Sequence, residues 1–393
     1  MAAFGAATST GIHIPEEWST AAAAIANDST TSLPPLVFIC GAKNTGKTTF
    51  SRYLLNTLLL RYKRVAYLDT DVGQPEFTPP GCLSLTIIDE ATPDFTIPCL
   101  KTPQRCYFFG DISSKRDPKA YLSCISALYD HYTKEQQISS KNGSSAAAEL
   151  PLIINTPGWV KGIGYDILLG MLDVIAATHV VKINISSESK NLPAGAFWLE
   201  RNNDHSAKLV EITSARKDSR NQSLLVRKEA HLIRELRLMA YFRQCFPSNM
   251  SITTVKELAH ALSSHTPYQV PISSIKIRHL HCEVPNTEVF YSLNATIVGL
   301  AVSCEDSQSL PVCAGLGIVR GIDVLKNIIY LITPVPQRIL AGVDLLLQGY
   351  IQIPTSLLQV QGCMSPYMSA NVISINYKEE DKSSPNKQSC RNE

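Results

Sequence analysis

A loop bounded by two glycines is the strongest chemical signal in this sequence of 393 residues. Residues 41–48, Gly-Ala-Lys-Asn-Thr-Gly-Lys-Thr, match the phosphate-binding pattern G-x-x-x-x-G-K-[ST]. In such a P-loop, successive backbone N–H groups and the start of the following helix form a cradle for phosphates. Lys47 is expected to reach the β- and γ-phosphates, and the Thr48 hydroxyl to bind Mg²⁺. The predicted ATP-binding residues are Gly41, Ala42, Lys43, Asn44, Thr45, Gly46, Lys47, Thr48 and Thr49.

Two carboxylates follow the next predicted strand, in the segment Asp-Thr-Asp-Val-Gly-Gln at residues 69–74. Carboxyl ends of parallel strands lie where α/β sheets bind ligands, so both acids can face a triphosphate. One would order Mg²⁺ through water, and the other would accept a proton from the nucleophile. Asp71 is expected to lie further out along the strand and is assigned as the base, and Asp69 is assigned to the metal. The sequence leaves open the reverse assignment and a purely structural role in capping the next helix.

A third polar segment, residues 155–162, follows another predicted buried strand and has the sequence Asn-Thr-Pro-Gly-Trp-Val-Lys-Gly. Thr156 is placed to donate a hydrogen bond near the γ-phosphate, and Gly158 to permit close backbone approach. Trp159 is either a platform for stacking a nucleobase or a core residue. The segment after residues 179–185 lacks the Asn/Thr-Lys-x-Asp element of guanine-specific sites, which favours ATP or a nucleotide-tolerant pocket.

The elements that must position these residues alternate between strand and helix. This alternation predicts an α/β fold with a doubly wound, mainly parallel sheet of the P-loop NTPase type. Continuous apolar runs indicate buried strands, and helical periodicity indicates the helices between them. Strands are expected at residues 36–40, 64–68, 106–109, 152–154 and 179–185, and helices at 47–62, 118–132 and 164–177.

Four segments are expected along the chain. Residues 1–33 are rich in Ala, Ser and Thr and predict a weakly ordered leader. The P-loop domain spans residues 34–247 and contains a flexible insertion at 133–149. Residues 248–377 predict a β-rich C-terminal domain, and residues 378–393 a disordered tail. In the β-rich domain, strands are expected at residues 275–281, 289–297, 315–319, 328–332 and 349–353.

Composition excludes several classes of protein. Hydrophobic residues make up 45% and charged residues 18%, which is typical of a folded globular chain. No run reaches about 18 apolar residues, so no membrane span or membrane partner is expected. The N-terminus lacks the pattern of a secretory signal, and 11 cysteines without repeated spacing favour reduced thiols.

A net charge of +2 gives no global sign of nucleic-acid binding. The densest basic stretch lies between residues 201 and 243, and it is either a contact surface for an RNA backbone or a solvated helix face. Its members are Arg201, Lys208, Arg216, Lys217, Arg220, Arg227, Lys228, Arg234, Arg237 and Arg243.

Together, the three motifs resemble the polynucleotide 5′-hydroxyl kinases of the pre-mRNA cleavage-complex and nucleolar ribosomal-RNA-processing type. Residues 330–334, 345–349 and 353–354 are more similar to the nucleolar branch, and we expect a plant form. The resemblance covers about residues 33–374. It departs from the family ahead of Gly41, where no large folded N-terminal domain is expected.

The resemblance implies transfer of the γ-phosphate of ATP, with Mg²⁺, to the 5′-hydroxyl of RNA. It implies RNA with a 5′-hydroxyl end and rRNA-processing factors as partners, and a location in the nucleus and nucleolus. Arg234 and Arg237 are implied as arginines of a helical lid over the transferred group. The implied substrate-binding residues are Gln74, Thr156, Gly158, Trp159 and Lys161.

Two alternatives remain open. A transferase or ligase acting on a small metabolite would share the P-loop and both aspartates but has no need of Trp159 or the basic stretch. A non-catalytic ATP-binding assembly factor would keep the loop and tolerate loss of Asp71. Transfer of label from γ-labelled ATP to a 5′-hydroxyl RNA separates the kinase from both.

Overall fold

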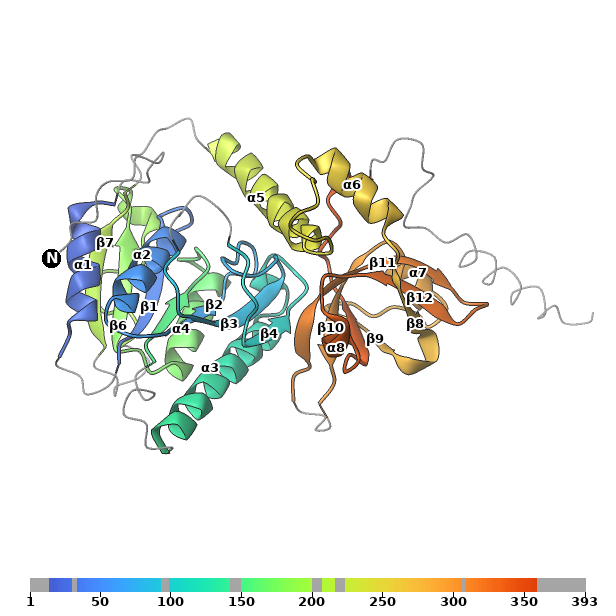
Figure 1. The fold of residues 1–393 in the computed structure, drawn as a ribbon. Helices are drawn as coiled ribbons and strands as arrows, with labels where there is room; N and C mark the ends of the chain where they lie inside the picture. Colours follow the sequence, from blue (N-terminus) through green and yellow to red (C-terminus); the bar gives the residue numbers. More distant parts are fainter. Residues whose placement is uncertain are drawn as a thin grey trace, which may run out of the picture. The chain divides into compact units, whose positions relative to one another are not determined.

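The computed structural model describes residues 14–29, 34–92, 99–141, 150–199, 207–215, 223–304 and 309–358. The chain forms two compact units, residues 1–237 and residues 238–393 (Figure 1). The boundary falls inside helix α5 (Ser223–Arg243), whereas the sequence predicts it after residue 247. The predicted tail, residues 378–393, lies outside the described residues.

Unit 1 is built on a seven-stranded sheet with the order β4-β3-β2-β5-β1-β6-β7. Five adjacent strands pair in parallel, and β3 pairs antiparallel with both neighbours. This confirms the predicted mainly parallel α/β sheet, although the sequence predicts neither β3 nor β7. The strands are β1 (Leu36–Gly41), β2 (Val65–Asp69), β3 (Cys82–Ile88), β4 (Arg105–Phe108), β5 (Leu152–Asn155), β6 (His179–Asn184) and β7 (Lys208–Thr213).

Helices cover both faces of this sheet. β1 leads through α2 (Lys47–Leu59) to β2, and β5 leads through α4 (Ile163–Val174) to β6, in opposite directions along the strand order. Right-handed crossovers therefore place α2 and α4 on opposite faces. α3 (Pro118–Lys141) packs against α4, and α1 (Glu16–Ala26) packs against α2. The short helices η1 (Ser114–Arg116) and η2 (Glu188–Lys190) complete the described helices of this unit.

Helix α1 corrects the expectation of a weakly ordered leader at residues 1–33. Its apolar face is buried in the core that α2 forms with the sheet. Trp18 is 1% exposed, meets the Phe50 ring edge-on at 5.5 Å and donates from Nε1 to the Thr213 carbonyl at 2.7 Å. Small alanines let the helix approach closely, so an Ala-rich composition here marks packing rather than disorder. Residues 1–13 and 30–33 lie outside the described residues.

The predicted insertion at residues 133–149 is wrong for its first part. Helix α3 continues to Lys141 instead of ending near residue 132. Within it, Gln136 donates to the Leu150 carbonyl at 2.6 Å, which ties this part of the helix to the start of β5. Residues 142–149 lie outside the described residues.

Unit 2 contains a six-stranded sheet in the order β8-β12-β11-β10-β13-β9, which confirms the predicted β-rich C-terminal domain. Two predicted strands are wrong. Residues 289–293 form helix α7 ahead of β10, and residues 349–353 form no strand. The strands are β8 (Tyr268–Pro271), β9 (Lys276–His279), β10 (Ile297–Val302), β11 (Val312–Asp323), β12 (Ile328–Ile332) and β13 (Leu345–Gln348).

The helices of unit 2 are short. They are α6 (Val255–Ser264), η3 (Ile272–Ser274), α7 (Val289–Leu293), α8 (Gln337–Leu340) and α9 (Thr355–Leu358). Among the described helices of the whole chain, none has the length and apolar character needed to cross a membrane.

Candidate active site

The two glycines of the P-loop adopt backbone conformations that other residues disfavour. Gly41 has a φ of +146° and Gly46 a φ of +96°. A Cβ atom on Gly41 would lie 2.5 Å from the Ile183 carbonyl oxygen, and one on Gly46 would lie 2.6 Å from the ring of Trp18. A side chain at either position would displace the loop. The strand–loop–helix setting that the sequence predicts is therefore present between β1 and α2.

Lys47 is held at the centre of this loop. Its Nζ donates to the carbonyls of Gly41 at 3.1 Å and Ala42 at 2.8 Å, and the residue is 7% exposed. Burial lowers the pKa of Lys47 to about 8, and the negative charge of Asp71 opposes that shift. The ammonium is thus positioned by the loop itself, and the nearby acid, Asp71, lies in the loop that follows β2.

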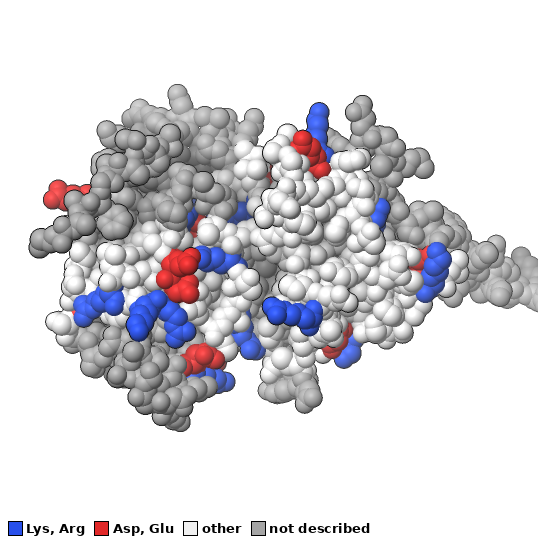
Figure 2. Space-filling view, in the orientation of Figure 1, with Lys and Arg blue, Asp and Glu red and all other residues white. Residues whose placement is uncertain are grey.

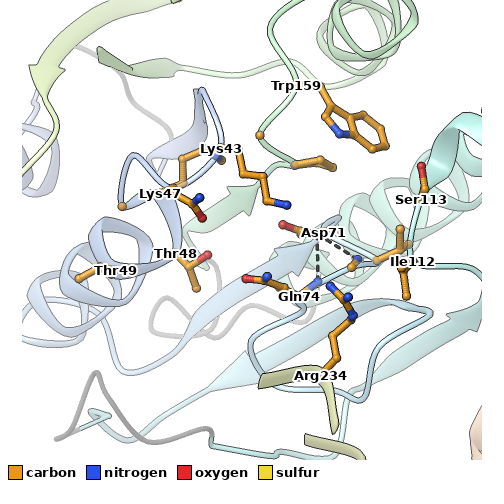
Figure 3. A pocket seen from close by; sticks show the side chains of 16 residues that line it. Lys43, Lys47, Thr48, Thr49, Asp71, Gln74, Ile112, Ser113, Trp159 and Arg234 are labelled. Atoms are coloured by element: carbon orange, nitrogen blue, oxygen red, sulfur yellow. Dashed lines mark hydrogen bonds between the residues drawn. The ribbon is translucent and has the colours of Figure 1, made fainter. Parts of the chain in front are cut away.

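A cleft of about 520 Å³ lies beside the P-loop, within unit 1 (Figure 3). Its walls come from the P-loop with the start of α2, from the segments after β2, β4 and β5, and from α5. The lining residues are Lys43, Asn44, Gly46, Lys47, Thr48, Thr49, Asp71, Val72, Gly73, Gln74, Ile112, Ser113, Pro157, Gly158, Trp159 and Arg234. Of the predicted ATP-binding residues, Gly41, Ala42 and Thr45 lie behind this surface and shape the loop.

Asp71 is fixed at the cleft by its own loop. Its Oδ1 accepts hydrogen bonds from the backbone N–H groups of Gly73 at 3.0 Å and Gln74 at 3.1 Å (Figure 3). These two backbone hydrogen bonds fix the direction of the carboxylate. The predicted base therefore lies in the same cleft as Lys47 and Thr48.

Asp69 has a different environment, because it is fully buried and is not among the residues that line the cleft. Its Oδ2 accepts from the Glu76 N–H at 2.5 Å, and its Oδ1 accepts from Nδ2 of Asn155 at 3.2 Å. The same Asn155 nitrogen lies 3.5 Å from the Thr48 hydroxyl. Burial raises the pKa of Asp69 to about 7. The Asn155 side chain thus separates Asp69, the predicted metal-binding acid, from the predicted metal-binding hydroxyl of Thr48.

The segment after β5 contributes Gly158 and Trp159 to the cleft. A Cβ atom on Gly158 would lie 2.5 Å from Cα of Lys43, so the close approach that this glycine permits is to the P-loop backbone. The indole of Trp159 lines the cleft, and Nζ of Lys115 lies 5.7 Å from its ring centre. Trp159 is therefore a cleft residue and not a core residue.

Two predicted substrate-binding residues do not reach the cleft. Thr156 is fully buried and donates its hydroxyl to the Ile39 carbonyl at 2.8 Å, which fastens β5 to β1. That hydroxyl is turned into the sheet, away from any phosphate at the cleft surface. Lys161 is exposed and is not among the lining residues.

The two predicted lid arginines have different surroundings. Arg234 lines the cleft, where burial lowers its pKa and the charge of Asp71 opposes the shift. Arg237 is 6% exposed and forms an ion pair with Glu76, its Nη2 lying 3.1 Å from Oε2. The structure brings only Arg234 to the cleft.

Sequence reasoning missed Ile112 and Ser113 as site residues. They follow β4, which is antiparallel to β3 and hence runs parallel to β2. The end of β4 therefore lies at the same edge as the P-loop, and the polar turn after the predicted strand at 106–109 was the available signal. Asn155 and Glu76 were also missed, because their contacts join segments that are distant in sequence.

Much of the basic stretch at residues 201–243 lies outside the described side chains, namely Arg201, Arg216, Lys217, Arg220, Arg227 and Lys228. Of the described members, Lys208 pairs with Asp28 at 2.6 Å, and Arg243 donates to the carbonyls of Phe246, Pro247 and Met250. On the face in Figure 2, the described Lys and Arg side chains are scattered among uncharged and acidic residues. The RNA-contact interpretation of this stretch stays a prediction.

The donor set fits a magnesium nucleotide. The glycine-shaped loop accommodates phosphate only because no Cβ fills its turns, and Thr48 and Asp69 supply hard oxygen atoms of the kind Mg²⁺ prefers. Asn155 contacts both groups through its Nδ2, and its buried Oδ1 has no hydrogen-bond partner in the part of the chain that the structure describes. An ammonium, an acid and a guanidinium facing one cleft can neutralise a triphosphate and receive a proton.

Two family models match the chain. The model described as mRNA cleavage and polyadenylation factor CLP1 P-loop matches residues 41–244, and the one described as NOL9-like, C-terminal domain matches residues 263–354. The matches cover the three motifs in unit 1 and the sheet of unit 2.

Curated relatives carry a consistent name. A protein of Arabidopsis thaliana named polynucleotide 5′-hydroxyl-kinase NOL9 is 59% identical over 363 residues, which cover 92% of this chain and 96% of the relative. The Bos taurus protein of the same name is 32% identical over 390 residues, covering 86% of this chain and 53% of its own length. The chain thus spans nearly all of the plant relative and about half of the cattle one.

Solved structures show the same fold. Two structures of Clp1p with Pcf11p have TM-scores of 0.58 and 0.57 at 15% and 16% identity. Each match covers 82% of this chain and 76% of the other. At this identity the likeness concerns the fold alone.

Proposed function

This chain belongs to the NOL9-type family of polynucleotide 5′-hydroxyl kinases, and we propose that it transfers the γ-phosphate of ATP to the 5′-hydroxyl of RNA. One observation carries the proposal. Lys47, Asp71 and Arg234 come from three separate elements and line one cleft beside the P-loop. Phosphoryl transfer needs positioning and charge neutralisation more than covalent catalysis, and this cleft supplies both.

On the donor side, the P-loop amides and Lys47 hold the β- and γ-phosphates of ATP. Thr48 would hold Mg²⁺ directly and Asp69 through water, and the bound ion would neutralise phosphate charge. The pairing of Asn155 with both residues keeps their oxygen atoms aligned. Arg234 faces the same space and would neutralise the transferred phosphoryl group.

On the acceptor side, Asp71 receives the proton of the attacking 5′-hydroxyl. The new bond joins the 5′-oxygen to the γ-phosphorus, and the bond from that phosphorus to the β,γ-bridging oxygen breaks, so that ADP leaves. Trp159 lines the cleft at its rim, where the terminal base of the RNA can stack on the indole. The preferred acceptor is therefore a polynucleotide end and not a small alcohol.

The proposed setting is ribosomal RNA processing in the nucleolus, with rRNA-processing factors as partners. Support comes from the kinship with the NOL9-named relatives and from the match to the NOL9-like C-terminal domain. The role of the basic stretch in holding the RNA backbone belongs to the same proposal and predicts binding that weakens as salt rises.

A transfer assay tests this function. The protein is incubated with γ-labelled ATP, Mg²⁺ and a 5′-hydroxyl RNA oligonucleotide, beside the same RNA carrying a 5′-phosphate. Label is expected only on the hydroxyl-ended RNA. Label on neither RNA, with ATP binding intact, would favour a non-catalytic ATP-binding factor or an enzyme acting on a small metabolite.

A further inference from the structure

Glu76 lies at the centre of a buried charge cluster outside the cleft. The residue is 4% exposed, and its carboxylate contacts two arginines. Oε1 lies 2.9 Å from Nη1 of Arg52, and Oε2 lies 3.1 Å from Nη2 of Arg237. Arg52 and Arg237 are 2% and 6% exposed, so all three charged groups are shielded from water.

This cluster joins three parts of the catalytic machinery. Arg52 belongs to α2, the helix that begins at Lys47. Arg237 belongs to α5, three residues after Arg234. The backbone N–H of Glu76 donates to Oδ2 of Asp69 at 2.5 Å. One residue therefore contacts the P-loop helix, the cleft-lining helix and the acid behind Thr48.

Arg234 and Arg237 of α5 have different places: Arg234 lines the cleft, and Arg237 belongs to the charge cluster around Glu76. Residues three apart on a helix lie on the same face, so Arg234 and Arg237 both project toward the Asp69–Glu76 segment. Arg234 lines the cleft, and Arg237 does not. Fixing Arg237 to Glu76 thus fixes the rotation of this helical turn, and with it the direction in which Arg234 points.

Electrostatics favours a positioning role over a stabilising one. Burial raises the pKa of Glu76, and the charges of Arg237 and Arg52 oppose that shift. A buried ion cluster of this kind adds little net stability compared with apolar side chains of similar volume, whereas moving one member away from its partner leaves an uncompensated buried charge. Such a cluster suits a site whose geometry must be exact.

We propose that Glu76 and Arg237 are positioning residues that hold Arg234 in the cleft, and that Arg237 is not a second catalytic arginine. The proposal rests on the proposed kinase function, because it assigns how the arginine facing the transferred phosphate is kept in place.

A double-mutant cycle on Arg234 and Arg237 tests this. Arg234→Ala, Arg237→Met and the double variant are compared for kcat with 5′-hydroxyl RNA. They are also compared for the affinity of Mg²⁺, ADP and aluminium fluoride, which together mimic the transferred phosphoryl group without needing an acceptor. If Arg237 acts only through Arg234, each single variant loses activity and the double variant is no worse than Arg234→Ala, within about twofold. Losses that multiply, or a near-normal Arg237→Met, would overturn the proposal.

Two further variants separate positioning from loosened packing. Glu76→Gln should reproduce the Arg237→Met loss and should likewise add nothing once Arg234 is absent. Arg52→Met removes the other ion pair of Glu76 without touching α5, and should lower the melting temperature while retaining more of kcat than Arg237→Met. Equal loss of kcat in Arg52→Met and Arg237→Met would assign the effect to packing and contradict the proposal.

The two readouts also separate this inference from the proposed function. If wild type labels no 5′-hydroxyl RNA but still binds Mg²⁺, ADP and aluminium fluoride, the proposed kinase function is wrong. The double-mutant cycle measured by the affinity of that complex then decides the role of Glu76. If the mimic does not bind wild type at all, the cleft takes no nucleotide and both proposals fall.

Discussion

Asp69 and Asp71 show how one intervening residue can place two carboxylates in different environments, which suits the two roles proposed for them. Strand β2 ends at Asp69, so this side chain stays in the sheet and is fully buried, whereas Asp71 follows in the loop and lines the cleft. Only Asp71 can meet an incoming hydroxyl without rearrangement. Asn155 links Asp69 to Thr48, which lines the cleft, and this arrangement fits an acid that orders water around a metal.

Much of the site could be predicted from the sequence, because a P-loop motif fixes the residue spacing and the backbone path together. The directions in which the side chains of Thr156 and Arg237 point could not be predicted from the sequence. Thr156 turns toward the Ile39 carbonyl on the neighbouring strand, and Arg237 toward Glu76, a residue far away along the chain. Local sequence gives the place of such a side chain on its element but not the partner across the fold.

Trp159 gives the residue-scale prediction. Replacing Trp159 with Ala should raise KM for RNA about 5- to 150-fold, the equivalent of the roughly 1–3 kcal/mol that stacking on one base contributes. KM for ATP should change little, because the P-loop holds the phosphates. Steady-state kinetics with each substrate varied in turn measures both.

Trp159→Phe is the matched control for that substitution, since it keeps an aromatic face and should lose less RNA affinity than Trp159→Ala. Equal losses for RNA and ATP would contradict the stacking role.

At the scale of elements, α1 supports the P-loop from outside. Trp18 contacts the helix start at Gly46 and donates to Thr213 on β7, while the Ser214 hydroxyl donates to the Thr45 carbonyl. The loop is therefore enclosed between α1 and the end of β7. Composition alone misses this helix, because Ala-rich segments occur in leaders and in tightly packed helices alike.

Removing the Trp18 side chain tests this support. Trp18→Ala should lower the free energy of unfolding by about 3–5 kcal/mol, the usual range for emptying a large aromatic site in a core. It should also weaken ATP binding, because Gly46 loses the ring that backs it. Denaturant titration and calorimetry measure the two effects. Trp18→Phe keeps an aromatic ring but loses the Nε1 hydrogen bond, so its free energy of unfolding should lie between those of wild type and Trp18→Ala. A Trp18→Ala variant as stable as wild type would contradict the place of α1 in the core.

His179 gives a pH-dependent prediction for the sheet. Its side chain is buried on β6, with Nε2 3.1 Å from Asp28 beyond α1, and burial lowers its pKa below 6.5 while the charge of Asp28 opposes the shift. As pH falls below about 7 the unfolded chain takes up the proton first, so His179 costs stability on acidification. The stability difference between wild type and His179→Gln should therefore shrink between pH 8 and pH 5. If this stability difference instead grows toward pH 5, the ion pair with Asp28 outweighs burial in setting the pKa of His179.

Other elements were missed or mistaken for physical reasons. Most of the parallel strands follow from continuous apolar runs, but the parallel strand β7 mixes polar and apolar residues, and only its Ile212 is buried. Residues 289–293, Val-Phe-Tyr-Ser-Leu, include one β-branched and two aromatic residues, yet they form the short helix α7, whose Leu293 is buried in the core of unit 2. Tertiary packing overrode local propensity there.

At the scale of the whole molecule, the three tryptophans of the sequence, Trp18, Trp159 and Trp198, all lie in unit 1. Tryptophan fluorescence should therefore follow the unfolding of the nucleotide-binding unit, whereas circular dichroism follows both units. Tryptophan fluorescence can therefore distinguish ligand effects on unit 1 from those on unit 2 in the intact chain.

A non-hydrolysable ATP analogue with Mg²⁺, at about 100 times its dissociation constant, should stabilise the fluorescence-detected transition by about 2.7 kcal/mol. Removing Mg²⁺ with a chelator should reduce the shift, and Lys47→Ala should largely abolish it. A shift of equal size in Lys47→Ala would mean that the analogue binds elsewhere.

The central claim is that phosphoryl transfer takes place in the cleft between the P-loop and Asp71. The most direct measurement is the rate of label transfer from γ-labelled ATP to 5′-hydroxyl RNA by Asp71→Asn, with the fluorescence shift on analogue binding as proof of an intact nucleotide site. The rate should fall about 10²- to 10⁴-fold, the range for loss of a general base, while the shift is retained. Transfer at a near-normal rate would show that the proton is accepted elsewhere and that this cleft does not work as described.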